Sequence, residues 1–174
     1  MYRRRGRVEE HKEFEEGVLQ IDRVTKVVKG GKILKFRVTM VIGDKKGRVG
    51  IGIGKAREIP SAIKKGIADA KRNLVTVPIK NNTIPMRITS KSGAGYVFLA
   101  PAVKGTGIVA GRVVKAIAEK AGIEDLLSKT LGTANPLNVA NAMLAAFRDM
   151  DTIIHRKEMM KREIARGENE NTEF

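Results

Sequence analysis

The sequence contains no cysteine and no tryptophan, and its aromatic side chains are five Phe and two Tyr among 174 residues. The absence of cysteine excludes a disulfide scaffold and any zinc site built from thiolates. The scarcity of rings argues against a protein that stacks many unpaired bases. The two histidines, His11 and His155, lie in polar terminal segments and are expected on the surface, so they offer little for catalysis.

Long apolar stretches are also missing, and no run reaches the roughly 18 residues that a membrane-spanning helix needs. The basic start, Met1–Val8, is followed by the acidic stretch Glu9–Glu16, whereas a secretory signal peptide needs an apolar segment there. We therefore expect a cytoplasmic protein with no membrane partner.

Positive charge is what the sequence has in excess: 34 Lys and Arg stand against 19 Asp and Glu, a formal net charge of +15. In residues 29–65, eleven Lys or Arg are interleaved with seven Gly and only two acidic residues. Lys and Arg bind phosphate groups, and glycine lets the backbone approach a ligand closely. A polyanion is therefore the expected partner. The arginines at 3, 4, 5 and 7 form either another such contact or only a solvated terminus.

The first half of the chain predicts a pair of strands joined by a tight turn. Val18–Lys29 is rich in β-branched residues, and its alternation slips at Asp22–Val24, as a β-bulge would cause. The pair Gly30-Gly31 predicts a hairpin turn. Apolar residues then occupy every second position over Leu34–Ile42, which predicts a strand with one buried face and one basic outer face.

A third strand and a helix follow a second hairpin turn at Gly43–Gly47. In Val49–Gly54, glycine alternates with Val or Ile, and two explanations stay open: the backbone approaches a ligand, or a helix packs closely. Ile59–Leu74 has the period of an amphipathic helix, with Pro60 in the first turn, where proline is tolerated. The expected apolar stripe is Ile59, Ile63, Ile67, Ala70 and Leu74, and the opposite basic side is Arg57, Lys64, Lys65, Lys71 and Arg72.

The second half, beyond a turn-rich boundary at Pro78–Pro85, is nearly neutral and predicts another α/β unit. Strands are expected at 86–90, 96–100 and 125–131. A glycine-rich loop, Lys104–Gly107, leads into a helix that ends near Ala121 and is closed by Gly122. Asn135-Pro136 has the pattern of an N-cap followed by proline at the first helical position.

Three glycine patterns resemble binding loops without meeting their requirements. Gly50–Lys55 lacks the first glycine of a Walker A loop, and Ala56 stands where Ser or Thr would hold magnesium. Gly105–Ala110 matches the dinucleotide pattern G-x-G-x-x-A, but no repeated parallel βαβ pattern surrounds it. Gly47–Gly50 is a GXXG at the start of a strand, whereas the KH module places that loop between helices.

No catalytic constellation accompanies these loops. A cysteine nucleophile is absent, and the basic segment lacks paired carboxylates that could hold magnesium or exchange protons. We expect a protein that is not an enzyme and that uses no cofactor and no metal.

Several motifs together give a close resemblance, over roughly residues 16–150, to the ribosomal protein S5 family of the bacterial small subunit. They are VTKVVKGGK at 24–32, GDKKGRVGIGIGKAR at 43–57, residues 59–64, GTGIVAG at 105–111 and GTANPLNV at 132–139. The resemblance implies an α+β fold of two small α/β sandwich domains. The N-terminal domain, 17–80, would be a β-β-β-α unit like a double-stranded-RNA-binding domain. The C-terminal domain, 84–150, would contain a left-handed βαβ crossover. The basic and acidic N-terminal arm at 1–16 and the polar tail at 151–174, both recognised by their composition, lie outside the match.

The resemblance also implies a structural role in the small ribosomal subunit. That role is binding 16S ribosomal RNA, supporting subunit assembly and the side where messenger RNA enters, and contributing to translational accuracy. The expected protein neighbours are the fourth and eighth small-subunit proteins. The loop at Val28–Lys32 matches one near the hinge where spectinomycin binds, and Gly107–Lys115 matches a segment tied to fidelity. Arg112-Val113-Val114 departs from the family, which often has a second glycine after Gly111, so this surface is expected to differ in detail.

The residues expected to contact ribosomal RNA belong to the two hairpins, the glycine strand and the basic helix face. They are Arg23, Lys26, Lys29, Gly30, Gly31, Lys32, Lys45, Lys46, Arg48, Gly50, Gly52, Gly54, Lys55, Arg57 and Lys64. Those expected at a protein interface tied to fidelity are Gly105, Gly107, Arg112 and Lys115. Two other functions stay open: a small-molecule phosphotransferase using the loop at 105–107, and a free-standing regulator that binds duplex RNA outside the ribosome.

Overall fold

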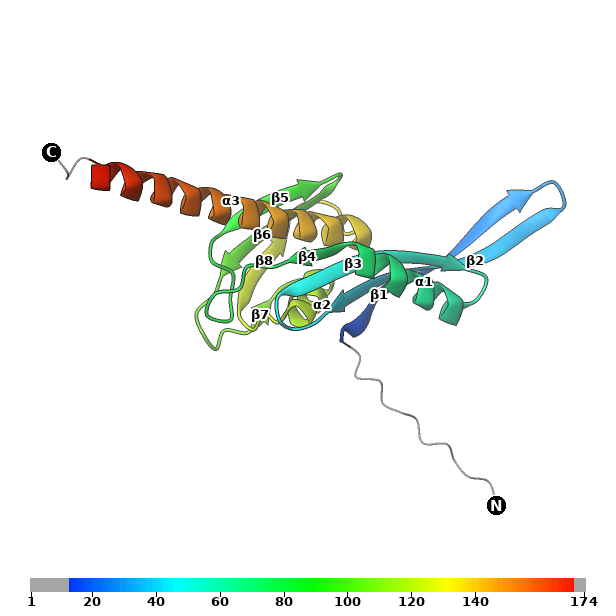
Figure 1. Ribbon diagram of the computed structural model, residues 1–174. Helices are drawn as coiled ribbons and strands as arrows, with labels where there is room; N and C mark the ends of the chain where they lie inside the picture. Colours follow the sequence, from blue (N-terminus) through cyan, green and yellow to red (C-terminus); the bar gives the residue numbers. More distant parts are fainter. Residues whose placement is uncertain (1–12, 171–174) are drawn as a thin grey trace, which may run out of the picture.

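The structure, a computed structural model, describes residues 13–170 and contains two four-stranded sheets and three helices within that range (Figure 1). The first sheet has the strand order β1-β2-β3-β4 and the second has β5-β6-β8-β7. The fold is α+β, as predicted. In chain order the elements are β1 (Glu15–Val28), β2 (Gly31–Gly43), β3 (Arg48–Ala56), α1 (Ile59–Arg72), β4 (Leu74–Thr76), β5 (Ile88–Ser92), β6 (Gly95–Pro101), β7 (Ile108–Val109), α2 (Arg112–Ala121), β8 (Leu126–Thr130) and α3 (Pro136–Glu170).

The β1–β2 hairpin forms as expected, with two corrections to its register. The strands shift register between Val18 and Gln20, so the bulge lies at Leu19 and not at Asp22–Val24. The extra residue turns the Leu19 side chain into the core, where it is buried. Val28 pairs with Gly31, so the turn consists of residues 29 and 30 rather than the two glycines.

The α1 helix packs directly on the glycines of β3. A Cβ atom added to Gly54 would lie 1.8 Å from the Ala62 carbonyl oxygen, and one added to Gly52 would lie 2.2 Å from the Gly66 carbonyl oxygen. The helix therefore contacts the strand through backbone. Of the two explanations for these glycines, close helix packing is confirmed.

This packing also corrects the expected apolar stripe of α1. The residues buried against the sheet are small, Ala62, Gly66 and Ala70, because a larger side chain would hold the helix away from β3. Ile59, which was expected inside, is 36% exposed.

The other face of the first sheet is covered by α2 and α3, which lie between the two sheets. Val41, Val49 and Ile51 of β2 and β3 belong to one core together with residues of α2, α3, β6 and β8. Thr39 is only 3% exposed for the same reason. The expected basic outer face of the second strand was therefore wrong beyond residue 37, because the second domain covers it.

The second sheet contains the parallel crossover that the resemblance implied, since β7 pairs in parallel with β8 and α2 connects them. Its left-handed sense stays a prediction. The α3 helix begins as predicted, because the Asn135 side-chain oxygen accepts a hydrogen bond from the Leu137 amide at 3.2 Å. It continues to Glu170, so the expected polar tail is helical as far as the structure describes it (Figure 1). None of the helices described is long and apolar enough to cross a membrane.

The β2–β3 turn, residues 44–47, joins the two domains. Its Lys45 and Gly47 amides donate to the carbonyl oxygens of Lys120 and Ala121, both at 3.0 Å. Carbonyl groups at a helix C-terminus have no partner within the helix, so the first domain caps α2 of the second. Glu15 strengthens this joint by pairing with Lys45 at 2.5 Å and with Lys120 at 2.8 Å.

Replacing Gly54 with Ala is expected to destabilise the fold by about 1–3 kcal/mol, because the new methyl group would overlap the backbone of α1. Gly30→Ala is the matched control, since nothing lies within 4 Å of the Cβ it would add. Urea unfolding followed by circular dichroism measures both variants. Equal stabilities would contradict the close packing of α1 on β3.

The Glu15 carboxylate makes the stability of the joint depend on pH. Hydrogen bonds from Lys120 and then Lys45 lower the pKa of Glu15 from 4.5 to about 2. A carboxyl whose pKa falls on folding stabilises the native state above its ordinary pKa and loses that contribution as the pH approaches its folded pKa.

The parent protein should therefore melt at a higher temperature than Glu15→Gln at neutral pH, and the difference should shrink between pH 4.5 and about 2. Scanning calorimetry across this range measures it. Glu119→Gln is the control, because it removes an exposed carboxylate of α2 for which no ion pair is found among the described residues. A difference for Glu15→Gln that does not change with pH would contradict the prediction.

Candidate nucleic-acid interface

The most prominent basic feature is an arm formed by the outer part of the β1–β2 hairpin, residues 23–35, which projects from the body of the protein (Figure 1). β3 pairs with β2 only over Phe36–Gly43, so within residues 13–170 the arm has two strands and no third beside them. It contains five Lys or Arg and no acidic residue. These cations are Arg23, Lys26, Lys29, Lys32 and Lys35, and all five are exposed.

The pairing register places cations on both faces of the arm and at its tip. Side chains directly opposite each other share a face and alternate along each strand, so Arg23 and Lys32 lie on one face and Lys26 and Lys35 on the other. Lys29 lies in the turn, where Gly30 has open space around it. Because the arm carries cations on both faces and at its tip, it can contact anionic groups on either side.

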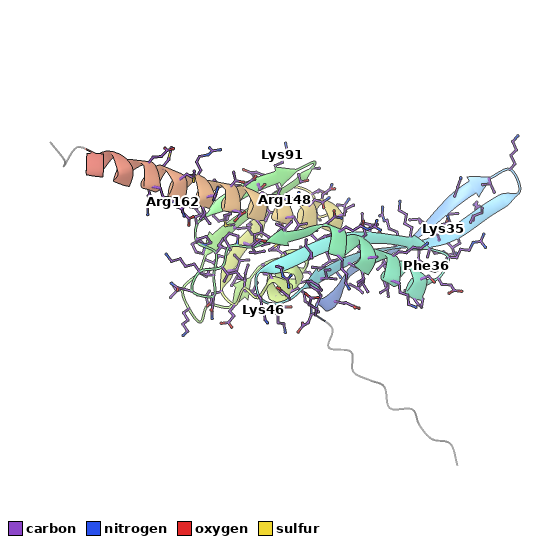
Figure 2. The ribbon with its side chains drawn as sticks, in the orientation of Figure 1. Lys35, Phe36, Lys46, Lys91, Arg148 and Arg162 are labelled. Carbon is purple, nitrogen blue, oxygen red and sulfur yellow. The ribbon has the colours of Figure 1, made fainter. Side chains whose placement is uncertain are left out.

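The base of the arm is marked by an ion pair between strands. Arg37 donates through Nε and Nη2 to Oδ2 of Asp22 at 3.0 and 2.8 Å. Asp22 thereby compensates the charge of Arg37. The cations of the arm that no acidic residue of the arm compensates begin at Arg23, the residue after Asp22. Figure 2 shows Lys35 at the start of the projecting part, while Lys46 lies on the body of the protein away from the arm.

A second basic surface is the outer side of α1 with the adjoining end of β3. Its exposed cations are Lys55, Arg57, Lys64, Lys65, Lys71 and Arg72. The carboxylate of Asp69, which the sequence placed at the margin of this side, accepts a hydrogen bond from the Ile53 amide at 2.9 Å. Asp69 thus satisfies an amide on the edge of β3 that β4 is too short to reach.

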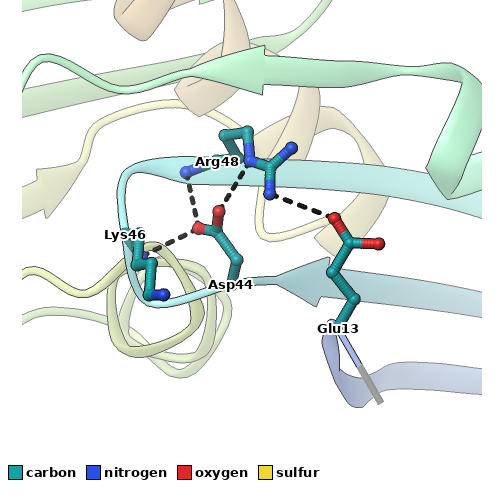
Figure 3. Close-up of polar contacts among 4 residues, drawn as sticks. All are labelled: Glu13, Asp44, Lys46 and Arg48. Atoms are coloured by element: carbon teal, nitrogen blue, oxygen red, sulfur yellow. Dashed lines mark hydrogen bonds and ion pairs between the residues drawn. The ribbon is translucent and has the colours of Figure 1, made fainter. Parts of the chain in front are cut away.

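The β2–β3 turn is organised around Asp44 (Figure 3). Its carboxylate accepts hydrogen bonds from the Lys46 amide at 2.8 Å, the Arg48 amide at 2.9 Å and Arg48 Nε at 2.6 Å. Burial acts to raise the pKa of Asp44, but these bonds from Arg48 and Lys46 outweigh it and lower the pKa. The same contact with Asp44, together with Glu13, raises the pKa of the Arg48 guanidinium.

This geometry separates the three cations expected to bind RNA at the turn. Lys45 pairs with Glu15, and Arg48 pairs with Asp44 and Glu13. Lys46 is exposed, and no ion pair is found for its side chain among the described residues. The turn is therefore a joint between domains whose cations are largely compensated within the chain.

The expected RNA contacts of Gly50, Gly52 and Gly54 are wrong. All three are buried under α1, and the atoms nearest to an added Cβ belong to the helix backbone. The strand offers no bare backbone to a ligand on that side.

The glycine loop at 105–107 binds a carboxylate of its own chain. The amides of Gly105 and Gly107 donate to Oδ1 of Asp125 at 3.0 and 2.8 Å, and Asp125 is only 3% exposed. A phosphate loop would need those amides free, so the phosphotransferase hypothesis loses its site. No group of three potential metal ligands occurs in the described part of the chain. Arg112 and Lys115 lie exposed on the first turns of α2, which follows this loop.

Sequence reasoning missed several residues of these surfaces. Lys35 was not proposed for RNA contact, although its charge and its position in the arm could have indicated it. Asp125 gave no such indication, because its role depends on a contact across 18 and 20 residues of sequence. His155 is exposed, as expected, whereas His11 and the four N-terminal arginines lie outside the described residues.

In comparison with known proteins, both domains match the same protein family. Residues 14–78 match the family described as ribosomal protein S5, N-terminal domain, and residues 90–162 match ribosomal protein S5, C-terminal domain. Small ribosomal subunit protein uS5 of Thermotoga neapolitana is 50% identical over 141 residues, which cover 81% of this chain and 79% of that protein. The protein of the same name from Chloroflexus aurantiacus is 49% identical over 156 residues, which cover 87% of each chain. The chain therefore belongs to the ribosomal protein S5 family.

Proposed function

We propose that this chain is a structural constituent of the small ribosomal subunit in the cytoplasm and binds 16S ribosomal RNA through its arm and the outer side of α1. The observation that carries the proposal is the arm, residues 23–35, with five cations, no acidic residue and no third strand beside it in the described part of the chain. Such an arm offers an RNA partner both charge and unpaired strand edges. An isolated two-stranded hairpin is only marginally stable in water, so a partner that covers it also stabilises it.

The family is one of ribosomal proteins and not of enzymes. The loop at 105–107 agrees with this, since its amides are already bonded to Asp125.

Recognition through these surfaces depends on phosphates and shape. Folded RNA has a deep, narrow major groove that side chains cannot read, so the contacts go mainly to phosphates and 2′-hydroxyls. Each phosphate neutralised by a Lys or Arg releases counterions, which makes binding sensitive to salt. From residue 23 to the turn the arm extends about 20 Å, at ~3.4 Å per residue, so its tip reaches RNA well away from the body.

The second domain is the proposed contact for neighbouring proteins, the fourth and eighth of the small subunit. Gly105 and Gly107 lie in the loop before β7, where Asp125 accepts hydrogen bonds from both of their amides, and Arg112 and Lys115 lie exposed on the first turns of α2. Because these loop amides are already bonded within the chain, the loop suits protein contact better than phosphate binding. Through these contacts we propose roles in subunit assembly, at the side where messenger RNA enters, and in translational accuracy.

Replacing Lys29 and Lys32 with Ala should weaken binding to 16S ribosomal RNA and reduce the slope of log K against log salt by up to roughly 2 units, ~0.7–0.9 per lost phosphate contact. The reason is that both lysines are exposed on an arm that has no acidic residue to compensate them. Filter binding or fluorescence anisotropy at several salt concentrations gives the slope.

The matched control is Lys157→Ala with Lys161→Ala, which removes the same charge from exposed positions on α3. A slope reduced equally by both pairs would show that only net charge matters, and an unchanged slope for the arm variant would place its lysines in solvent. Co-sedimentation with small subunits that survives a high-salt wash separates a ribosomal constituent from a free-standing regulator that binds duplex RNA.

A further inference from the structure

Four cations gather around the segment that leads into β1, residues Glu13–Glu15. Glu13 pairs with Arg48 at 3.3 Å, and Glu15 pairs with Lys45 at 2.5 Å and Lys120 at 2.8 Å. Between these two residues, the ring of Phe14 makes cation–π contacts with Arg48 and Lys71. Its centroid lies 5.2 Å from the Arg48 guanidinium carbon and 5.9 Å from Nζ of Lys71. Three consecutive residues therefore contact cations of the β2–β3 turn, β3, α1 and α2.

One of these cations, Lys71, belongs to the outer side of α1 that is proposed to bind RNA. Arg48, at the start of β3, contacts the same Phe14 ring. The acidic segment thus contacts that surface at Lys71, whereas the arm, residues 23–35, contains no acidic residue.

The contacts are of the kind that a phosphate can replace. The Arg48 and Glu13 side chains are 47% and 70% exposed, and those of Lys45 and Glu15 are 57% and 47% exposed. Exposed ion pairs contribute little net free energy, because water and salt screen them. RNA, with its denser negative charge, can compete for the same donors.

We propose that Glu13–Glu15 is an internal substitute for RNA phosphates, which occupies Arg48, Lys45 and Lys71 in the free protein and releases them to RNA. The segment lowers affinity for RNA in general, so that only an RNA that also engages the arm displaces it. This inference rests on the proposed function, since it needs the chain to bind RNA.

The joint imposes a limit on what can be released. The Lys45 amide caps α2 and stays in place, so the release involves side chains and not the backbone of the turn. Arg48 also keeps its bond to Asp44 at 2.6 Å, which orients its guanidinium toward the surface whether or not Glu13 is bound.

The test is the double variant Glu13→Gln with Glu15→Gln, measured with 16S ribosomal RNA and with an RNA duplex of roughly 20 base pairs, somewhat longer than the site of a double-stranded-RNA-binding domain. Both RNAs should bind roughly 3- to 10-fold more tightly, the effect of losing two exposed ion pairs. The salt slope should increase by up to about 2 units as Lys45 and Arg48 become available. Adding Arg48→Gln to the double variant should remove much of the gain.

Glu119→Gln with Glu158→Gln is the matched control, because it deletes two exposed carboxylates for which no ion pair is found among the described residues. An equal gain in RNA affinity for the control variant would show that only the net charge of the protein matters, and this would overturn the inference. Weaker binding by the Glu13 and Glu15 variant would also overturn it, since the segment would then support RNA binding. If the double variant fails to fold by circular dichroism, Glu13→Gln alone leaves the joint intact and should show a smaller gain.

The two proposals fail separately. If Lys29→Ala with Lys32→Ala leaves the salt slope unchanged, the arm does not bind RNA and the proposed function is wrong. If that variant behaves as expected but the Glu13 and Glu15 variant binds RNA like its control, the proposed function stands. Only the proposal that Glu13–Glu15 substitutes for RNA phosphates is then wrong.

Discussion

The structure depends on the burial of β2 and β3 on both faces. On one face α1 approaches so closely that Gly50, Gly52 and Gly54 have backbone where a side chain would be. On the other face Val41, Val49 and Ile51 pack with α2 and α3 in a core shared by the two domains. Such a sheet tolerates no charge in its centre, because burying an unpaired charge is costly.

That constraint sorts the cations to the edges of the molecule. Most cations of the first domain lie on the arm, where no third strand or helix of residues 13–170 covers them, on the outer side of α1, and at the β2–β3 turn. The first two surfaces keep their charge, whereas the turn is largely compensated by Glu13, Glu15 and Asp44. The net charge of +15 is therefore not spread over one uniform patch, because carboxylates of the chain compensate some groups of cations and leave others uncompensated.

The joint between the domains is both structural and electrostatic. Backbone amides of the turn cap α2, and Glu15 links Lys45 to Lys120 across the boundary. The cations nearest the joint thus hold the fold together, and those of the arm, farthest from it, are the ones proposed to bind RNA. The segment Glu13–Glu15 contacts cations of both kinds, because Glu15 pairs with Lys120 at the joint and Phe14 contacts Lys71 on the outer side of α1.

The sequence by itself determined the longer strands, the three helices, the caps at Asn135 and Gly122, and the basic character of the arm, because these follow from local periodicity and composition. The short strands β4 and β7 were not predicted, because each has only two or three residues and is defined by its pairing with a neighbouring strand. The sequence located the turn and the bulge only to within a few residues, since register depends on pairing with β2. Only the tertiary structure decided which face of the glycine strand is covered, which cations are paired, and that the amides of Gly105 and Gly107 are taken by Asp125. Each of these depends on groups distant in the sequence that folding brings within hydrogen-bond or van der Waals distance.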